Sequence, residues 1–293
     1  MTFLNWHPEK DKSITPMEID LHNQLHARLA QEHNIESLLK NRRLKIFPYI
    51  EKKLNVQLHG QILDIGCGSG YASTWLALHR KIEKIYALES SPSAVSDFIP
   101  RVLAHFGVEN KVTPVLGSFN NIPDKNKFDY IIAFGALHHS GDLLNTVKQC
   151  YEALRPGGYL IIQEPALSDY VSNNDYIKRY EAEETFRGIT KIRNKERHDH
   201  FFRTCEYKTA FHFTGFEIHF FRPKILFDMS VISGIRWFQK SVNRLYCQLA
   251  SGITQKWPYS DDTKLFSFIA ALYKPDTEPE YIPHIWKNLS KSD

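Results

Sequence analysis

Short apolar runs alternate with helical patterns through the middle of the chain. Five segments carry such runs: 62–65, 84–89, 112–116, 128–134 and 153–162. Their lengths suit buried parallel strands, and a helical pattern begins near Tyr71, directly after the first of them. Strands that alternate with helices predict an α/β fold in which helices cover both faces of a mostly parallel sheet.

The hydrophobic pattern predicts further elements on either side of this core. Residues 17–54 are expected to be mostly helical, because leucine and isoleucine recur at helical spacing. A helical stretch at 205–213 leads through a Thr-Gly turn into an apolar run that ends at Phe221, which predicts a sixth strand. The apolar run within 264–273 predicts the last strand, and the tail from Pro275 is expected to lie on the surface or fray.

Two insertions surround the sixth strand. Residues 165–203 are polar and charged, with a helix expected over 175–187 followed by a basic run of Arg187, Lys191, Arg193, Lys195 and Arg197. Residues 225–257 carry an apolar stripe at helical spacing, formed by Ile235, Phe238, Val242, Leu245 and Leu249. We therefore expect a helical extension over 1–59, a core over 60–164, insertions over 165–263, and the last strand with the tail over 264–293.

Composition limits the classes of protein that need consideration. The 293 residues are 42% hydrophobic and 24% charged, which is ordinary for a globular protein. A net charge of +4 is too small to indicate a nucleic-acid partner, so none is expected. The four cysteines are scattered, and the sequence shows neither a signal peptide nor an apolar run of membrane-spanning length, so we expect a cytoplasmic protein. The sequence does not predict an oligomeric state.

The first strand runs directly into a glycine-rich loop. The segment Asp64-Ile65-Gly66-Cys67-Gly68-Ser69-Gly70 has the pattern G-x-G-x-G, with an acid two residues before it. Glycines let the backbone approach a ligand closely, and a strand–glycine turn–helix unit builds nucleotide sites in α/β sheets. Dinucleotide binders carry G-x-G-x-x-G instead, and a carboxylate at Asp64 suits a ligand with an amino group better than one with only phosphates.

Several segments together resemble one known family. The stretch Leu63–Gly70, the acid Glu89 at the end of the second strand, and Leu154-Arg155-Pro156-Gly157-Gly158 before the fifth are similar to motifs of the class I S-adenosylmethionine (SAM)-dependent methyltransferases. The resemblance covers about residues 60–164. It implies a Rossmann-like seven-stranded sheet with helices on both faces. Its last strand would run antiparallel between strands five and six, and a helical N-terminal extension would cap the cofactor pocket.

The resemblance also implies which residues contact SAM. The loop residues Asp64, Gly66, Cys67, Gly68 and Gly70 would hold the methionine end of SAM, and Glu89 would accept the ribose hydroxyls. Ser118 and Phe119 occupy the corner that holds the adenine, where an acid is more usual than Ser118, and Phe134 ends the neighbouring strand. For Phe119 a place in the core remains an equal alternative.

The loop after the fourth strand contains the best candidates for a general base. His138 and His139 follow Phe134-Gly135-Ala136-Leu137, and the resemblance places this loop at the reactive centre. An oxygen nucleophile needs a base, a role that histidine fills near neutral pH. The alternative is that both histidines only pack or bind backbone. His198, His200 and Tyr170 are reserve candidates. No metal site is expected, because neither the His22–His26 pair nor the His198–His200 pair has a third ligand at suitable spacing.

The predicted function is methyl transfer from SAM to a small-molecule acceptor, most simply O-methylation of a sugar, a sugar nucleotide or a natural product. The loop lacks the Asn/Asp-Pro-Pro-aromatic turn of amine-directed nucleic-acid enzymes and the double-glutamate hairpin of protein-arginine enzymes. The insertions would form a lid, and their basic residues suit an anionic acceptor. Three alternatives remain: a SAM-binding relative without catalysis, a NAD dehydrogenase, and a membrane-surface enzyme with a lipid-linked acceptor, since Arg236, Trp237 and Lys240 flank the stripe.

Overall fold

A computed structural model gives the fold, and it describes residues 2–7, 20, 23–24, 35–40, 42–167, 169, 202–224 and 265–277. Several predictions lie outside these residues: the helix at 175–187, the basic run 187–197, the apolar stripe of 225–257, Arg236, Trp237, Lys240, His22, His26, Tyr170, His198 and His200. Most of the predicted lid therefore stays a prediction, whereas the whole predicted core, residues 60–164, is described.

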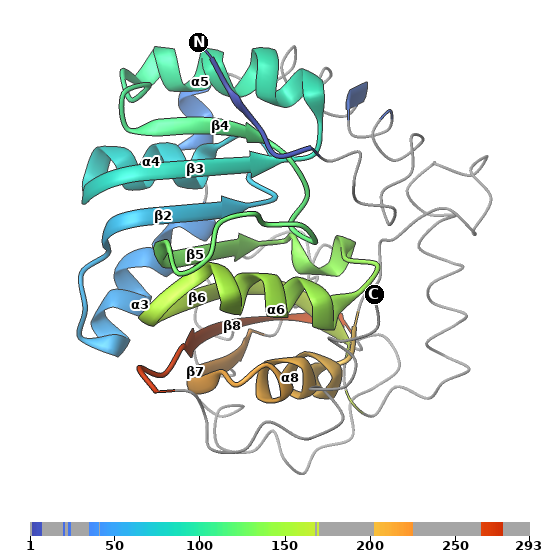
Figure 1. Cartoon of the computed structure of the whole chain (residues 1–293). Coiled ribbons are helices and arrows are strands. Elements are labelled where there is room, and N and C mark those ends of the chain that lie inside the picture. Colours follow the sequence, from blue (N-terminus) through green and yellow to red (C-terminus); the bar gives the residue numbers. More distant parts are fainter. Residues whose placement is uncertain are drawn as a thin grey trace, which may run out of the picture.

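An eight-stranded sheet forms the centre of the molecule (Figure 1). Its strands are β1 (Leu4–Asn5), β2 (His59–Ile65), β3 (Lys81–Glu89), β4 (Val112–Leu116), β5 (Phe128–Phe134), β6 (Leu154–Leu167), β7 (Glu217–Lys224) and β8 (Leu265–Tyr273). The spatial order is β1-β4-β3-β2-β5-β6-β8-β7. Strands β1 to β6 pair in parallel, and β8 lies antiparallel between β6 and β7. The predicted fold class, with an antiparallel last strand inserted beside the fifth predicted strand, is confirmed.

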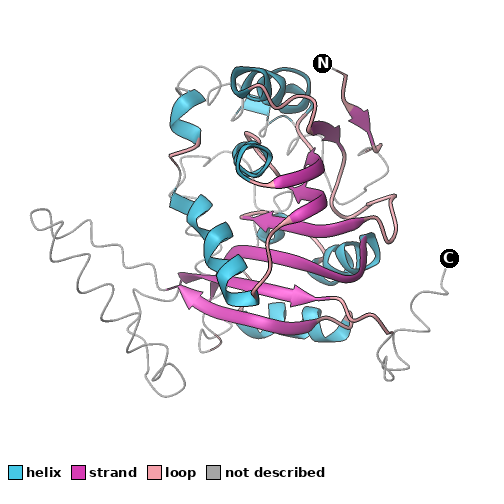
Figure 2. Cartoon of the chain, turned by 90° about the vertical axis from the view of Figure 1, so that its left-hand side faces the viewer, coloured by secondary structure: helices cyan, strands magenta, loops and turns pink. Residues whose placement is uncertain are grey.

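Helices cover both faces of the sheet, as the two orthogonal views show (Figures 1 and 2). Among the described residues the α-helices are α2 (Ile35–Leu38), α3 (Ile46–Leu54), α4 (Tyr71–His79), α5 (Ile99–Phe106), α6 (Leu143–Ala153) and α8 (Thr204–Phe213). Short 3-10 turns occupy Arg42–Lys45 and Leu137–His139, and a π-helical turn, Ala94–Phe98, leads into α5. Helices α6 and α8 pack on one face, and α3, α4 and α5 pack on the other.

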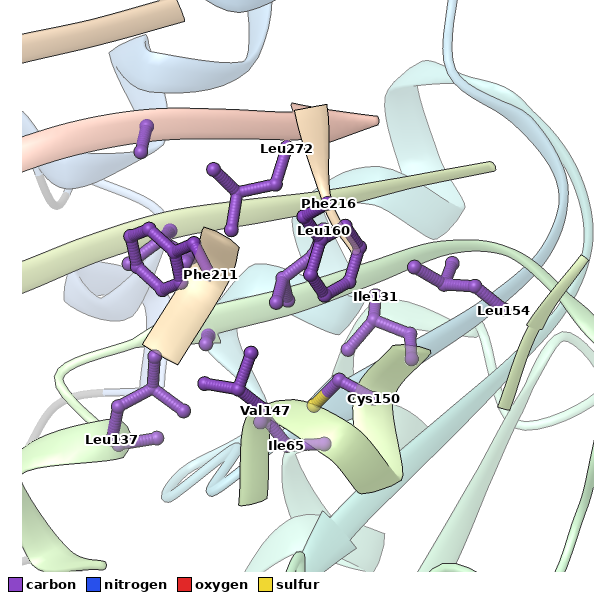
Figure 3. Packing of buried hydrophobic residues seen from close by; sticks show 14 of the residues in the cluster. Ile65, Ile131, Leu137, Val147, Cys150, Leu154, Leu160, Phe211, Phe216 and Leu272 are labelled. Atoms are coloured by element: carbon purple, nitrogen blue, oxygen red, sulfur yellow. The ribbon is translucent and has the colours of Figure 1, made fainter. Parts of the chain in front are cut away.

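Two hydrophobic clusters, one on each face, hold the layers together. Figure 3 shows the cluster under α6 and α8, where Val147 and Cys150 of α6 and Phe211 of α8 meet Ile131 and Leu160 of the sheet. All five of these side chains are fully buried. At roughly 25 cal/mol per Å² of apolar area, burial on this scale is the main term that stabilises the fold.

The first strand, β1, differs from expectation, because residues 4 and 5 lie in the segment expected to be a helical extension. They pair in parallel with Val115 and Leu116 of β4. The backbone N–H of Trp6 donates to the Leu116 carbonyl at 2.7 Å, and the indole stacks on Tyr86 with ring centroids 6.4 Å apart. A strand of two residues is too short to give a periodic pattern, so this eighth strand could not be predicted from hydrophobic spacing.

The parallel strands all end at one edge of the sheet. Four strands end there at Ile65, Glu89, Leu116 and Phe134. On β6, which continues to Leu167, Gln163 pairs with Phe134 at the same level, and Glu164 follows it. In open α/β sheets this edge is where ligands bind. In the described part of the chain, no helix is both long and apolar enough to cross a membrane.

Candidate active site

The loop between β2 and α4 is shaped by its three glycines. Gly66, Gly68 and Gly70 have φ values of 59°, 57° and 71°, which are left-handed conformations that side chains other than glycine rarely adopt. A Cβ on Gly66 would lie 2.8 Å from the Cβ of Ala136. The glycines thus allow a tight turn at the start of α4, and they let this loop pack against the loop that follows β5.

Glu89, at the end of β3, is tied to the glycine loop. Its Oε2 accepts the backbone N–H of Gly68 at 2.9 Å, and its Oε1 accepts the N–H groups of Ser90 at 2.9 Å and Ser91 at 3.2 Å. The side chain is only 6% exposed, and these donors fix its orientation. Oε1 also accepts the Ser90 hydroxyl at 3.3 Å, so three of the four bonds go to Oε1. Because each carboxylate oxygen offers about two lone-pair positions, Oε2, which accepts the Gly68 N–H, keeps one position for a ligand hydroxyl.

Asp64 lies beneath the loop and is unusual in its ionisation. Burial raises the pKa of this carboxyl from 3.8 to about 7, and the nearby Glu89 adds to the shift. A hydrogen bond from Ser73 Oγ to Asp64 Oδ2, 2.6 Å long, opposes it. A buried acid that titrates near neutrality is typical of a functional site, because a cationic group beside it would recover the cost of ionising it.

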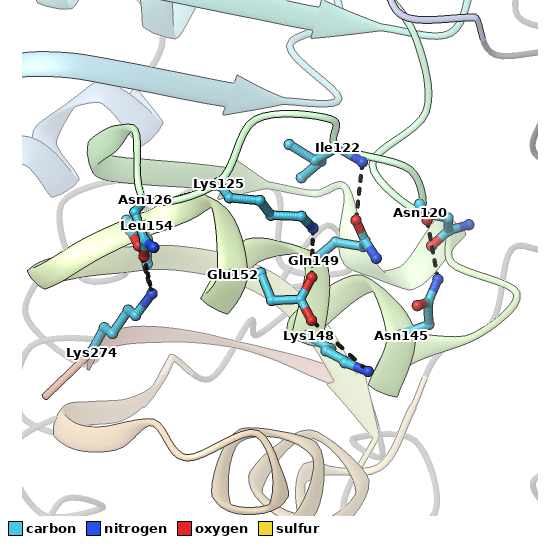
Figure 4. A network of polar contacts seen from close by, with 10 residues as sticks. All are labelled: Asn120, Ile122, Lys125, Asn126, Asn145, Lys148, Gln149, Glu152, Leu154 and Lys274. Carbon is cyan, nitrogen blue, oxygen red and sulfur yellow. Dashed lines mark hydrogen bonds and ion pairs between the residues drawn. The ribbon is translucent and has the colours of Figure 1, made fainter. Parts of the chain in front are cut away.

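The corner after β4 carries Ser118 and Phe119. Ser118 is 2% exposed, and its Oγ accepts the backbone N–H of Asn120 at 3.0 Å, so this hydroxyl stabilises the turn itself. Beyond the turn, α6 holds the loop in place (Figure 4). Asn145 donates to the Asn120 carbonyl at 3.1 Å, and Gln149 accepts the N–H of Ile122 at 3.2 Å. Phe119 packs against the core and lies 4.0 Å from the position of a Cβ on Gly66, which is beside the glycine loop.

The loop Gly135–His139 follows β5, which is separated in the sheet from β3 and Glu89 by β2. Glu164 of β6 is fully buried, and its Oε1 accepts the N–H groups of Ala136 at 2.7 Å and Leu137 at 2.9 Å. Its Oε2 lies 2.9 Å from Nδ1 of His138, whose side chain is 10% exposed. One carboxylate thus holds three consecutive residues of the loop. The His139 ring lies beside that of His138, with centroids 4.0 Å apart and the planes tilted by 39°, and His139 is less buried.

Residues from the N-terminal part of the chain reach the same edge. Arg43 lies beside Gly135: its Nη1 is 3.6 Å, and Cε1 of His138 is 3.8 Å, from the position of a Cβ on Gly135. Burial raises the pKa of the Tyr71 hydroxyl, and the adjacent Arg43 guanidinium opposes the shift. Asn23 Oδ1 accepts the hydroxyls of Ser91 and Ser93, at 2.7 and 2.8 Å, next to Glu89. Phe134 is 8% exposed and packs on Phe47 with ring centroids 5.2 Å apart.

The structure therefore brings the predicted site residues of the core to one edge of the sheet, in two neighbouring groups. Sequence patterns missed three further residues there. Glu164 lies 26 positions from His138, and Arg43 and Asn23 come from segments without a motif. The only available clue was the interruption of an apolar strand by Gln163-Glu164. Among the described residues no cluster of three or more His, Cys, Asp or Glu side chains could hold a metal ion.

Comparison with protein families and curated proteins gives two results. A family model for a methyltransferase domain matches residues 24–219, which is more than half of the chain and includes β2 to β6. Among curated proteins, a tRNA U34 carboxymethyltransferase of Pseudoalteromonas atlantica is 30% identical over 102 residues, which cover 35% of this chain and 31% of that enzyme. The chain thus matches only about a third of the length of such relatives.

Solved structures show the same fold over most of the chain. A protein assigned as a sarcosine dimethylglycine methyltransferase of Galdieria sulphuraria has a TM-score of 0.57 at 20% identity, over 80% of this chain and 86% of that one. A geranyl diphosphate C-methyltransferase from Streptomyces coelicolor A3(2), solved with Mg²⁺, geranyl diphosphate and S-adenosylhomocysteine, has a TM-score of 0.55 at 13% identity, over 78% of this chain and 77% of that one. At such identities the likeness concerns the fold alone.

Proposed function

Because the chain belongs to the methyltransferase-domain family of SAM-dependent enzymes, with SAM as its cofactor, we propose that it transfers the SAM methyl group to a hydroxyl of a small molecule. One observation carries this proposal. The glycine loop with Glu89, which suits a nucleoside, and the loop with His138, which suits a proton acceptor, lie at adjacent strand ends and pack together through Gly66 and Ala136.

The glycine loop with Glu89 and the residues around it suit SAM. Oε2 of Glu89 retains one lone-pair position for a ribose hydroxyl. Gly66, Gly68 and Gly70 carry no side chain that would keep the backbone from the cofactor, and the backbone of Cys67 lies between the first two. Asp64 would pair with the cationic amino group of the methionine end, and this pairing would recover the cost of ionising the buried acid. Phe119 and Phe134 offer apolar surface at its borders, with Ser118 at the adenine corner. Asn23, from the N-terminal extension, would cap the ribose side.

The chemistry requires little from the protein except position and a base. When bound, SAM supplies an electrophilic methyl group on a sulfonium, which is a good leaving group. His138 would take the proton of the acceptor hydroxyl on its ring, and the oxygen would keep the electron pair with which it binds the methyl carbon. The buried loop around His138 would exclude water and hold the acceptor at near-attack distance.

A second candidate acceptor is a nucleotide in RNA. It is supported by the relatives described as tRNA U34 carboxymethyltransferases, although the likeness covers only 102 residues. A small molecule is supported by the mild net charge of +4, because RNA enzymes commonly neutralise several phosphates with a basic surface. The predicted lid and the anionic group of the acceptor remain part of the proposal, as does a cytoplasmic location, which unpaired Cys67, Cys150 and Cys205 support.

A labelling experiment tests the proposal. The protein would be incubated with SAM that carries a tritiated methyl group, either with the small-molecule fraction of a cell extract or with total tRNA. We expect label in a small molecule, and no label with the Gly68→Val variant. Label in tRNA alone would replace the first candidate by the second. Absence of transfer to both pools, by a protein that still binds SAM in calorimetry, would favour a SAM-binding relative without catalysis.

A further inference from the structure

Glu164 occupies a position where an unpaired carboxylate would be costly. It is fully buried on β6, one residue beyond Gln163, which pairs with the last residue of β5, and Phe268 of β8 lies beside it in the sheet. In the part of the chain that the structure describes, no lysine or arginine forms an ion pair with it. A buried carboxyl group needs hydrogen-bond partners to replace water, and its three contacts to residues 136–138 supply them.

The three contacts are not chemically equivalent. The N–H groups of Ala136 and Leu137 can only donate, and both bind Oε1. These two bonds would be enough if Glu164 only held the loop in place. The third contact joins Oε2 to Nδ1 of His138 at 2.9 Å. When Glu164 is ionised it only accepts hydrogen bonds, so Nδ1 then carries the proton in this contact and the ring's lone pair lies on Nε2.

From this geometry we propose that Glu164 is a positioning residue that fixes His138 in the tautomer protonated at Nδ1, so that Nε2 is the atom that receives the acceptor's proton. The inference rests on the proposed function, since it names the atom that acts in that reaction. As the acceptor's O–H bond breaks, its proton goes to Nε2 and its electron pair stays on oxygen for the bond to the methyl carbon, whose bond to sulfur would break with the electron pair left on sulfur. The imidazolium that forms is then paired with the Glu164 carboxylate, which stabilises it.

The Glu164→Gln variant separates the positioning of His138 from the holding of the loop. The amide has one accepting oxygen and one donating NH₂ group. The two backbone N–H groups require the oxygen at the Oε1 position, so the NH₂ group must face Nδ1 of His138 and donate to it. The loop is still held by the two backbone bonds. His138, however, is forced into the tautomer that is protonated at Nε2, and Nε2 then cannot accept the acceptor's proton. We expect turnover to fall about a hundredfold with the fold retained.

Nitrogen NMR of the imidazole gives a readout that does not depend on activity. At pH 8, ¹⁵N-labelled wild type should show His138 protonated at Nδ1, and Glu164→Gln should show it protonated at Nε2. The matched control is Glu206→Gln, since Glu206 also accepts a backbone N–H, that of Arg203 at 2.6 Å, but at the start of α8. This control should leave the His138 tautomer and turnover unchanged.

A double-variant comparison completes the test, with tritiated SAM and the small-molecule fraction of a cell extract as the probe. If Glu164 acts through His138, Glu164→Gln combined with His138→Ala should be no slower than His138→Ala alone. Multiplied losses, or a wild-type His138 protonated at Nε2, would overturn the proposal; the wild-type spectrum decides even if Glu164→Gln does not fold. If the tautomers behave as expected while wild type labels no acceptor, the proposed function fails and the positioning of His138 stands.

Discussion

Two buried glutamates, Glu89 and Glu164, use the same device for different ends. Glu89 ends β3, and Glu164 lies on β6 one residue beyond the level at which β5 ends. Each is at most 6% exposed and accepts backbone hydrogen bonds from the loop of a neighbouring strand, one N–H for Glu89 and two for Glu164. Glu89 binds a loop of glycines, whose bare backbone can lie against a ligand. Glu164 binds a loop that presents an imidazole. A buried carboxylate can therefore organise either a binding surface or a reactive group, depending on the loop it holds.

The largest effect is expected when the glycine loop that Glu89 binds gains a side chain. Gly68→Val should weaken SAM binding about a thousandfold, or about 4 kcal/mol, because a branched residue at φ 57° is strained and its side chain would stand in the space proposed for the cofactor. Calorimetry measures the affinity, and circular dichroism checks folding.

The matched control for this change is Gly107→Val. Gly107 also has a left-handed conformation, with φ 66°, and a Cβ there would meet nothing within 4 Å. Its backbone strain should lower stability by about 1–3 kcal/mol without changing SAM affinity. Unchanged SAM affinity in a folded Gly68→Val protein would remove the cofactor from this loop.

A smaller effect is expected on the Glu164 side, where the imidazole of His138 can be removed. His138→Ala should lower turnover about a hundredfold, because the general base is lost, while SAM affinity stays within about twofold. His139→Ala should lower turnover less than about tenfold, since only His138 lies against Glu164. The exposed His105, substituted by alanine, serves as a control. Near-normal turnover in both loop variants would make the histidines structural.

The two glutamate sites also differ in how far the sequence alone could predict them. Glu89 and the glycine loop form a local pattern, with each acid and glycine next to the strand that positions it, and the predicted strands 112–116 and 128–134 match β4 and β5 residue for residue. Glu164 acts on residues 26 to 28 positions away, a contact that exists only once β5 and β6 pair. Its polar character also ended the predicted strand at residue 162, whereas β6 continues to Leu167.

The same physical limit explains the other differences. Arg43, Asn23 and β1 reach the site edge from the N-terminal part of the chain through tertiary packing, and no spacing rule connects them to the strands they contact. Patterns of period 2 or 3.6 report on a neighbourhood of the chain. They therefore predict which strand ends meet, but not which distant side chain completes a loop.

Asp64 gives the cofactor side a further property, because its ionisation makes that side sensitive to pH. Its pKa of about 7 lies above the ordinary value of 3.8, so the neutral form is favoured in the folded protein. The resulting stabilisation, up to about 4 kcal/mol, is fully present below about pH 4 and is lost as pH rises through about 7. Unfolding of the SAM-free protein between pH 5 and 8 should show this loss in wild type and not in Asp64→Asn.

Binding should follow the opposite trend with pH. The proposed ion pair with the amino group of SAM needs the carboxylate, so affinity should fall about tenfold between pH 8 and pH 6 in wild type. In Asp64→Asn the affinity should be lower at pH 8 and nearly constant over this range. Calorimetry at the two pH values measures both. A wild-type affinity independent of pH would place the SAM amino group elsewhere.

The smallest effect is expected at the adenine corner, where the polar side chain already has a structural partner. Ser118 Oγ accepts the N–H of Asn120, and α6 holds the same loop through Asn145 and Gln149. Ser118→Ala should therefore cost about 1 kcal/mol of stability and change SAM affinity less than about threefold. Ser118→Asp keeps an acceptor for Asn120 and adds a second oxygen, so it should match or exceed wild-type affinity. A large loss of affinity in Ser118→Ala, with stability unchanged, would instead mean that the hydroxyl serves the adenine, and the cofactor side would then hold its ligand through side chains as well as backbone.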